Sequence, residues 1–198
     1  MPRTVTTTDL AQERSRLGIP GRAAILAMLL LAGGPADARQ RPNPCRIDPA
    51  YRAFDFWLGS FTVAPFAEPE RVVGHNRISL AADGCALLEQ WEGASGGHGV
   101  SISRLDPITR RWAHHWAAPG CVIDLEGGPD DSGAMVMTGT ISYADARGTR
   151  PFTGRWAPLG DGQVRQTFRE QDPETGTWRP WFDGLHVPIA KTGADDVP

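Results

Sequence analysis

The 198-residue sequence lacks several motifs that would indicate a particular chemistry. It contains no Cys-x-x-Cys pair, no His-Glu-x-x-His sequence, no phosphate-cradling Gly-Lys loop and no Gly-x-Gly-x-x-Gly fingerprint after an expected strand. These absences argue against a cysteine-based metal centre, a zinc protease of that type and the common nucleotide-binding folds. The Gly-rich stretch 93–98 is expected to be a hairpin loop, since no helix follows it to present amide dipoles to an anion.

Clustered positive charge is also missing. The chain has 20 Lys and Arg residues against 23 Asp and Glu, a formal net charge of −3, and its basic residues are scattered singly apart from Arg110-Arg111. Nucleic acids and anionic membrane surfaces bind clustered positive charge. The charge pattern therefore argues against nucleic acids and against anionic membrane surfaces as partners. It excludes neither an enzyme nor a carrier.

Long apolar runs are absent except for one near the start of the chain. Residues 23–32 are apolar, follow Arg14, Arg16 and Arg22, and precede the small-residue sequence Ala36-Asp-Ala38. That order predicts a secretory signal peptide over residues 1–38. The alternative is a membrane anchor. The apolar run has about ten residues, however, and a helix needs ~20 to span a bilayer. We expect a soluble periplasmic or secreted protein with no membrane span after cleavage, a single domain over residues 39–190, and a disordered tail over 191–198.

Cysteine is scarce, and its number is odd. If the protein is exported, Cys45, Cys85 and Cys121 lie in a compartment where disulfides persist. We favour a Cys45–Cys85 bond, because it would tie the segment before the first strand to the rest of the fold. A Cys85–Cys121 bond is the alternative. Cys121 alternates with Ile123 and Leu125, and so also fits a small buried apolar position.

Turn residues recur every 8–12 residues from Ser60 onward, with short alternating segments between them. Such short connections force neighbouring strands to be antiparallel. The fold class is therefore all-β, an up-and-down meander closed into a barrel, with an open two-sheet sandwich as the alternative. Ten strands are expected: 60–66, 72–82, 85–92, 99–105, 111–117, 121–127, 134–143, 152–158, 163–171 and 178–186.

An aromatic segment precedes the first of these strands. The sequence Phe54-Asp-Phe-Trp-Leu-Gly-Ser-Phe61 places three aromatic residues within four positions before an alternating pair. This pattern predicts a short helical turn that packs under one end of the sheet as a plug.

Several sequences together carry a resemblance to a known family. They are Phe54-Asp-Phe-Trp-Leu-Gly59, Gly74-His-Asn76, Gly84-Cys-Ala-Leu-Leu-Glu-Gln-Trp91, Gly99-Val-Ser101, Trp112-x-His-x-Trp116, 160–166 and Trp178…Phe182-Asp-Gly184. Over roughly residues 45–187 the chain resembles a family of exported bacterial proteins of unassigned function, itself similar to calycin-like barrels such as lipocalins and fatty-acid-binding proteins. The resemblance implies a barrel with a central cavity, and it implies no reaction. Where His114 stands, the family is expected to have an amide side chain.

Strand alternation identifies candidate lining residues for that cavity. One face of 111–117 carries Trp112, His114 and Trp116, and one face of 85–92 carries Glu89 and Trp91. If both faces point inward, rigid aromatic walls and a few polar groups suit a small apolar or aromatic ligand. Trp156 and Arg165 complete the predicted set, with Arg155 and Glu170 as further residues that could reach the same space.

Each candidate also has a purely structural interpretation. The tryptophans pack any sheet, Glu89 fits an internal ion pair with an arginine, and His114 fits a hydrogen-bonded core position. His115 is expected to face solvent, and His75, His98 and His186 to be ordinary surface residues.

Three other functions remain open from the sequence. Glu89 and His114 could form an acid–base pair of a hydrolase or isomerase, although none of Ser79, Ser101 and Ser103 lies in a Gly-x-Ser-x-Gly turn. His114 or His98 could ligate haem, although no Cys-x-x-Cys-His is present. A structural envelope module would need no ligand, and no cofactor is required by any motif.

Overall fold

The computed structural model describes residues 42–190 of the chain. The predicted signal peptide and the predicted disordered tail lie outside these residues. Among the described residues, no helix has the length and apolar character needed to cross a membrane.

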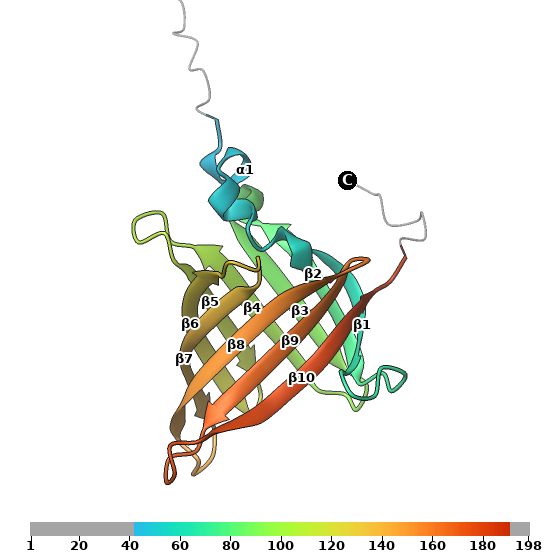
Figure 1. The fold of residues 1–198 in the computed structure, drawn as a ribbon, viewed down its shortest axis with the longest axis vertical. Helices are drawn as coiled ribbons and strands as arrows, with labels where there is room; N and C mark the ends of the chain where they lie inside the picture. Colours follow the sequence, from blue (N-terminus) through green and yellow to red (C-terminus); the bar gives the residue numbers. More distant parts are fainter. Residues whose placement is uncertain (1–41, 191–198) are drawn as a thin grey trace, which may run out of the picture. The chain divides into compact units, whose positions relative to one another are not determined.

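Ten antiparallel strands close into one barrel, and each strand pairs with the strands before and after it in the sequence (Figure 1). The closed meander is therefore confirmed, and the open sandwich is wrong. The strands are β1 Gly59–Pro65, β2 Gly74–Ala81, β3 Ala86–Gly93, β4 His98–Leu105, β5 Trp112–Ala118, β6 Cys121–Pro129, β7 Met135–Tyr143, β8 Thr149–Gly160, β9 Gln163–Gln171 and β10 Trp178–Pro188.

Alternating burial along the strands explains why the sheet closes. In β4 the residues Gly99, Ser101, Ser103 and Leu105 are buried and the residues between them are exposed. In β9 buried residues likewise alternate with more exposed ones. One face of every strand must leave water, and a closed barrel provides a single interior for all of them while leaving no unpaired sheet edge. Pairing of β1 with β10, which joins Phe61 to Pro188, completes the ring.

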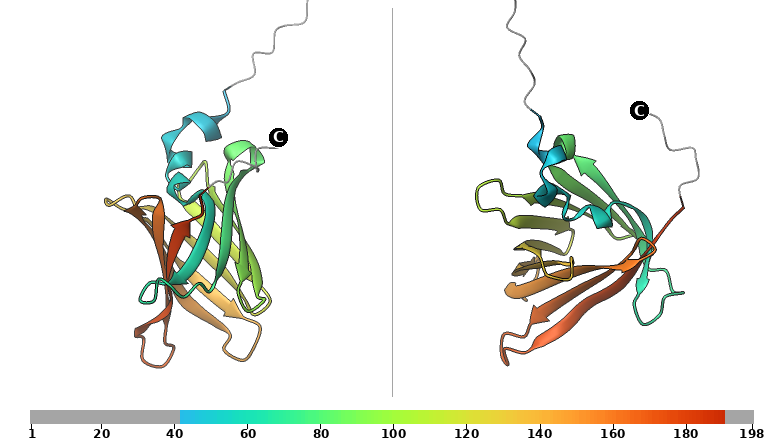
Figure 2. Two further views of the ribbon diagram at one scale, coloured as in Figure 1. Left: turned by 90° about the vertical axis from the view of Figure 1, so that its right-hand side faces the viewer. Right: turned by 45° about the horizontal axis from the view of Figure 1, so that its top comes forward.

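A short helical segment covers one end of the barrel (Figures 1 and 2). It consists of α1 Pro44–Ile47 and two 3-10 turns, η1 Pro49–Arg52 and η2 Asp55–Trp57. Phe54 and Trp57 are fully buried. The Phe54 ring packs edge-on against Trp112 and Trp156, with ring centroids 5.7 and 5.4 Å away. The predicted aromatic plug corresponds to the last part of this segment, Phe54–Trp57, and residues 59–61 already belong to β1. We call the whole segment, residues 44–57, the plug, and this end of the barrel the plugged end.

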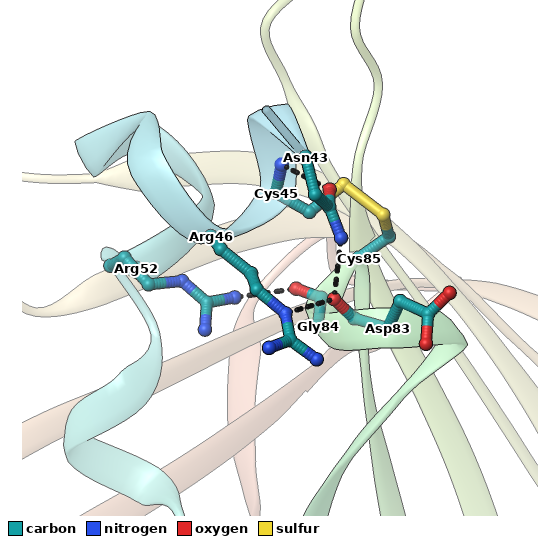
Figure 3. Close-up of a disulfide and its surroundings, with 7 residues drawn as sticks. All are labelled: Asn43, Cys45, Arg46, Arg52, Asp83, Gly84 and Cys85. Atoms are coloured by element: carbon teal, nitrogen blue, oxygen red, sulfur yellow. Dashed lines mark hydrogen bonds between the residues drawn. A yellow bond between two sulfur atoms is a disulfide. The ribbon is translucent and has the colours of Figure 1, made fainter. Parts of the chain in front are cut away.

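A disulfide joins Cys45 in α1 to Cys85, which follows the 3-10 turn η3 Ala82–Gly84 (Figure 3). The favoured pairing is thus confirmed, and Cys121 is a half-buried free thiol. Polar contacts strengthen the same junction, since the Arg52 guanidinium donates to the Gly84 carbonyl at 2.6 Å and Asn43 Nδ2 donates to the Asp83 carbonyl at 2.9 Å. The plug is therefore fastened to the β2–β3 connection both covalently and through hydrogen bonds.

The opposite end of the barrel, which we call the mouth, is ringed by the β1–β2, β3–β4, β5–β6, β7–β8 and β9–β10 connections. Inward-facing Trp91 and Trp116 near this end are only partly buried, whereas Trp57 and Trp112 at the plugged end are fully buried. The aromatic rings at the plugged end are thus fully buried, whereas Trp91 and Trp116 toward the mouth stay partly exposed.

Candidate functional site

Five polar side chains share the inner wall of strands β2 to β5. They are Asn76, Glu89, Ser101, Ser103 and His114, each no more than 3% exposed. Strand register places them together, since Glu89 is opposite Ser101 and Ser103 is opposite His114. We call this group the polar band. A buried polar cluster of this kind requires either internal hydrogen bonds or a polar ligand.

Glu89 lies at the centre of the polar band. Asn76 Nδ2 donates to one carboxylate oxygen at 2.6 Å, and Ser101 Oγ donates to the other at 2.5 Å. Burial raises the pKa of the Glu89 carboxyl to about 7, against the opposing effect of these two hydrogen bonds. Among residues 42–190 no Arg, Lys or His side chain forms an ion pair with Glu89, so the expected internal pair with an arginine is wrong.

His114 has a separate partner. Its Nδ1 lies 2.8 Å from Ser103 Oγ, and its ring packs against Trp156 with centroids 5.0 Å apart. Burial lowers the pKa of the imidazole to about 3, so the ring is neutral at physiological pH. In the described part of the chain, His114 Nε2 has no hydrogen-bond partner. Glu89 and His114 each bond to a different serine of β4 and not to one another.

His186 is a second buried histidine, and its predicted surface location is wrong. It is 1% exposed, and its Nε2 donates to the side-chain carbonyl of Gln166 at 2.8 Å. The expected strand ended at His186, but β10 continues to Pro188. His186 is therefore not at the edge of the strand. Alternation from Phe182 through Gly184 places its side chain on the inner face.

The aromatic residues of the predicted site divide into two groups. Trp112 and Trp156 are 1% and 0% exposed and pack against the plug, so they belong to the core of the plugged end. Trp91 and Trp116 lie closer to the mouth and are half-buried.

Glycines on neighbouring strands determine how these two half-buried rings lie. A Cβ atom at Gly74 would be 2.4 Å from the Trp91 ring, and one at Gly99 would be 2.2 Å from the Trp116 ring. Each indole therefore lies against the bare backbone of its neighbour, which only glycine permits. Rings that lie along the wall leave more of the lumen free than rings that project across it.

Arg165 does not belong to the predicted site. It lies on β9 between buried Val164 and Gln166 and points to the outer face, where it forms a bidentate pair with Asp183 at 2.7 and 2.8 Å. Its guanidinium also stacks on the Phe66 ring at 3.7 Å. Arg155 likewise points outward, toward Asp130. Strand alternation alone excludes both, because their immediate neighbours face inward.

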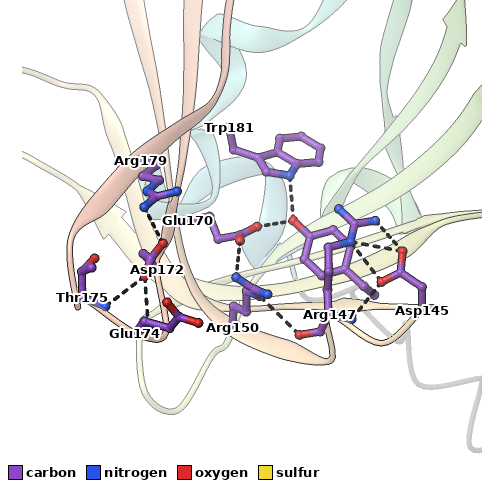
Figure 4. Close-up of polar contacts among 10 residues, drawn as sticks. Asp145, Arg147, Arg150, Glu170, Asp172, Glu174, Thr175, Arg179 and Trp181 are labelled. Carbon is purple, nitrogen blue, oxygen red and sulfur yellow. Dashed lines mark hydrogen bonds and ion pairs between the residues drawn. The ribbon is translucent and has the colours of Figure 1, made fainter.

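Glu170 is the one charged candidate of the later strands that reaches the inner face, close to the mouth. Tyr143 Oη donates to its carboxylate, Arg150 pairs with it at 3.3 Å, and Trp181 Nε1 donates to Tyr143 Oη at 2.9 Å (Figure 4). Burial, together with the hydrogen bond to Glu170, raises the pKa of Tyr143 to about 12. Unlike Glu89, Glu170 therefore has a cationic partner.

A hollow of about 690 Å³ lies on the outside of strands β4 to β7, lined mainly by outward-facing side chains such as Ile102, Arg104 and His115. His115 is exposed, as expected, and pairs with Asp124. Among the described residues, Asn76, His114, His186 and Trp156 keep unpartnered polar atoms and lie on the inner face of the strands, so the interior is the better candidate site.

No cluster of three potential metal ligands occurs within residues 42–190. No protein-family model matches the chain, and no curated protein matches it either. The resemblance to exported calycin-like barrels therefore stays a prediction from the sequence motifs, and the function must be argued from the geometry of the interior.

Proposed function

We propose that this protein is an exported, calycin-like barrel that binds one small, largely apolar or aromatic molecule in its interior, entering from the mouth. The disulfide fits a protein that resides in an oxidising compartment, such as the periplasm or the extracellular space. The closed barrel belongs to an architecture that commonly encloses a small ligand.

One observation carries this proposal: buried side chains around the interior, from the strands and from the plug, keep polar atoms without partners. Within the described residues these atoms are Asn76 Oδ1, His114 Nε2 and His186 Nδ1, together with the indole nitrogens of Trp57 and Trp156. A buried polar atom left without a hydrogen bond destabilises the fold by about 1–3 kcal/mol. These atoms belong to β2, β5, β8, β10 and the plug, so they surround the interior from several sides, as expected where a bound molecule supplies their partners.

The contacts do not favour an acid–base enzyme over a carrier. A general base must take up a proton in the working pH range, and a pKa of about 3 makes His114 a poor acceptor near neutrality. Glu89 could exchange a proton near pH 7, but its two oxygens already accept hydrogen bonds from Asn76 and Ser101. Binding is therefore the function that these residues support best.

Native mass spectrometry of the protein purified from the periplasm tests this proposal. We expect a mass above that of the folded chain, which is lost on mild unfolding and reduced in Trp116→Ala. Trp178→Ala is the matched control, because Trp178 is exposed on β10. Absorbance near 400 nm in the same sample would identify the extra mass as haem.

Two results together would overturn the proposal: a folded protein without added mass, and no saturable binding of any small apolar probe. They would identify the protein as a structural module.

A further inference from the structure

We infer that the ligand carries a protonated amine, and that this organic ammonium group binds Glu89 and Asn76 while its apolar or aromatic body lies between Trp91 and Trp116. This inference rests on the proposed function and names the chemical class of its ligand. It is carried by the charge, the hydrogen-bonding capacity and the aromatic surroundings of the Glu89 carboxylate.

The first argument concerns charge. Glu89 is 3% exposed, and the inward-facing residues of the adjacent strands are uncharged: Asn76 and Ile78 on β2, and Ser101 and Ser103 on β4. The one titratable neighbour in the polar band is His114, which is held neutral. A carboxylate buried without a counter-charge is strongly unfavourable. A cationic ligand would supply the charge that the protein itself does not.

The contrast with Glu170 supports this interpretation. Glu170 also faces the interior, but Arg150 and Tyr143 bind its carboxylate. The barrel thus pairs its other inward-facing carboxylate with an arginine and leaves Glu89 with neutral donors only. The difference marks Glu89 as the position where a cation can be accommodated.

The second argument concerns hydrogen bonds. Asn76 Nδ2 donates to Glu89, which leaves Asn76 Oδ1, a buried acceptor, without a partner. An ammonium group has only donors, as the lysine side chain does. It can therefore donate to the Glu89 carboxylate and to Asn76 Oδ1 at once, whereas a hydroxyl can donate to just one of them. An anionic ligand would meet two acceptors and a negative charge.

The third argument concerns the path from the mouth. Trp91 lies two residues from Glu89 on the same face of β3, which corresponds to about 7 Å along a strand. Trp116 is paired with Ser101, the second donor to Glu89. Tryptophan faces attract cations within about 6 Å, and more strongly where water is excluded. Both half-buried rings can therefore attract the ammonium group on its way from the mouth, and they offer aromatic surfaces for the apolar or aromatic body once the charged end reaches Glu89.

Three probes with the same ring and different charge test the inference: 2-(1-naphthyl)ethylamine, 1-naphthaleneethanol and 1-naphthaleneacetate, titrated calorimetrically at pH 7.5. We expect the amine to bind at least about tenfold more tightly than the alcohol, and the acetate to bind most weakly. In Glu89→Gln the affinity for the amine should fall about tenfold or more, while the affinity for the alcohol changes less than about threefold. Glu92→Gln is the matched control, since Glu92 is exposed on the outer face of the same strand.

The outcomes separate this inference from the proposed function. Equal affinities for amine and alcohol, both reduced in Trp116→Ala, would overturn the ammonium site and leave the carrier function standing. No binding of any probe up to millimolar concentration by the folded protein would overturn both. The comparison of the three probes on the unmodified protein does not depend on the folding of any variant, and circular dichroism verifies the fold of Glu89→Gln.

Discussion

Replacing Glu89 by glutamine should change how the stability of the barrel depends on pH. The substitution keeps the size of the side chain and removes its titration. In the folded protein burial raises the pKa of this carboxyl from its ordinary 4.5 to about 7, and in the unfolded chain water surrounds it. The neighbours from β2 and β4, Asn76 and Ser101, do not titrate in this range, and His114 stays neutral above about pH 3.

The sign follows from proton binding. Between pH 4.5 and 7 the folded protein keeps the Glu89 proton and the unfolded chain releases it, so the free energy of unfolding falls as pH rises through this window. One pKa unit corresponds to about 1.4 kcal/mol, so a shift of this size amounts to about 3 kcal/mol. The stability that a protonated Glu89 provides below pH 4.5 should therefore be lost above pH 7, and the glutamine variant should not lose it.

Urea denaturation of both proteins between pH 4 and 8 measures the effect. The free energy of unfolding of Glu89→Gln, minus that of the unmodified protein, should rise by about 3 kcal/mol from pH 4.5 to pH 8. With a denaturant slope of about 2 kcal/mol per molar, this equals a change of about 1.5 M in the difference between the two midpoints. Taking the difference removes the contributions of all other titrating groups. Glu92→Gln, on the outer face, should show no such trend.

A difference that stays constant within about 0.5 kcal/mol over this range would refute the reasoning. It would mean that the Glu89 carboxyl titrates in the folded protein as it does in water, and that the polar band is hydrated or already carries a counter-charge.

Two further perturbations test the framework of the barrel. Replacing Cys45 and Cys85 by serine opens a loop closed across 40 residues, and should lower the free energy of unfolding by about 4 kcal/mol by chain entropy, as measured by urea denaturation; a loss below 1 kcal/mol would show that the plug contacts alone fasten this segment. Gly99→Ala should destabilise the fold by about 1–3 kcal/mol and shift the fluorescence of the Trp116 indole, because the added methyl group would meet that ring at 2.2 Å. Gly97→Ala is its control, since nothing lies within 4 Å of the added methyl group there, and equal effects of the two substitutions would contradict the close packing of the ring.

The strands and the plug could be predicted because each depends on local sequence. The disulfide joins residues 40 apart, and it was predicted because it ties the segment before the first strand to the rest of the fold. Alternation and turn residues locate every strand, and the aromatic cluster at Phe54–Trp57 identifies the plug. Some strand limits differ from the expected ones. β8 begins at Thr149, before the expected Phe152, because a hydrogen bond from the Tyr143 amide to the Gly148 carbonyl closes the β7–β8 hairpin tightly.

The candidate site could be predicted only in part. Alternation shows which face of the barrel a residue occupies, but not how close it lies to the plug, so Trp112 and Trp91 looked equivalent. The partners of Glu89 depend on the register between strands, which brings Asn76 and Ser101 to the same carboxylate. Register is set by the hairpin connections and by packing of the whole interior, and no single stretch of sequence encodes it.

Closure of the barrel has a consequence for the order in which it forms. Neighbouring strands of the meander are joined by short connections, but β1 pairs with β10 across a sequence separation of 125 residues at Thr62 and Val187. Nine hairpins can assemble as the chain emerges, whereas the seam between β1 and β10 must wait for the last strand and overcome the largest loop entropy. An interior that shields Glu89 from water therefore exists only after the chain is almost complete, and any molecule that binds there meets a finished barrel.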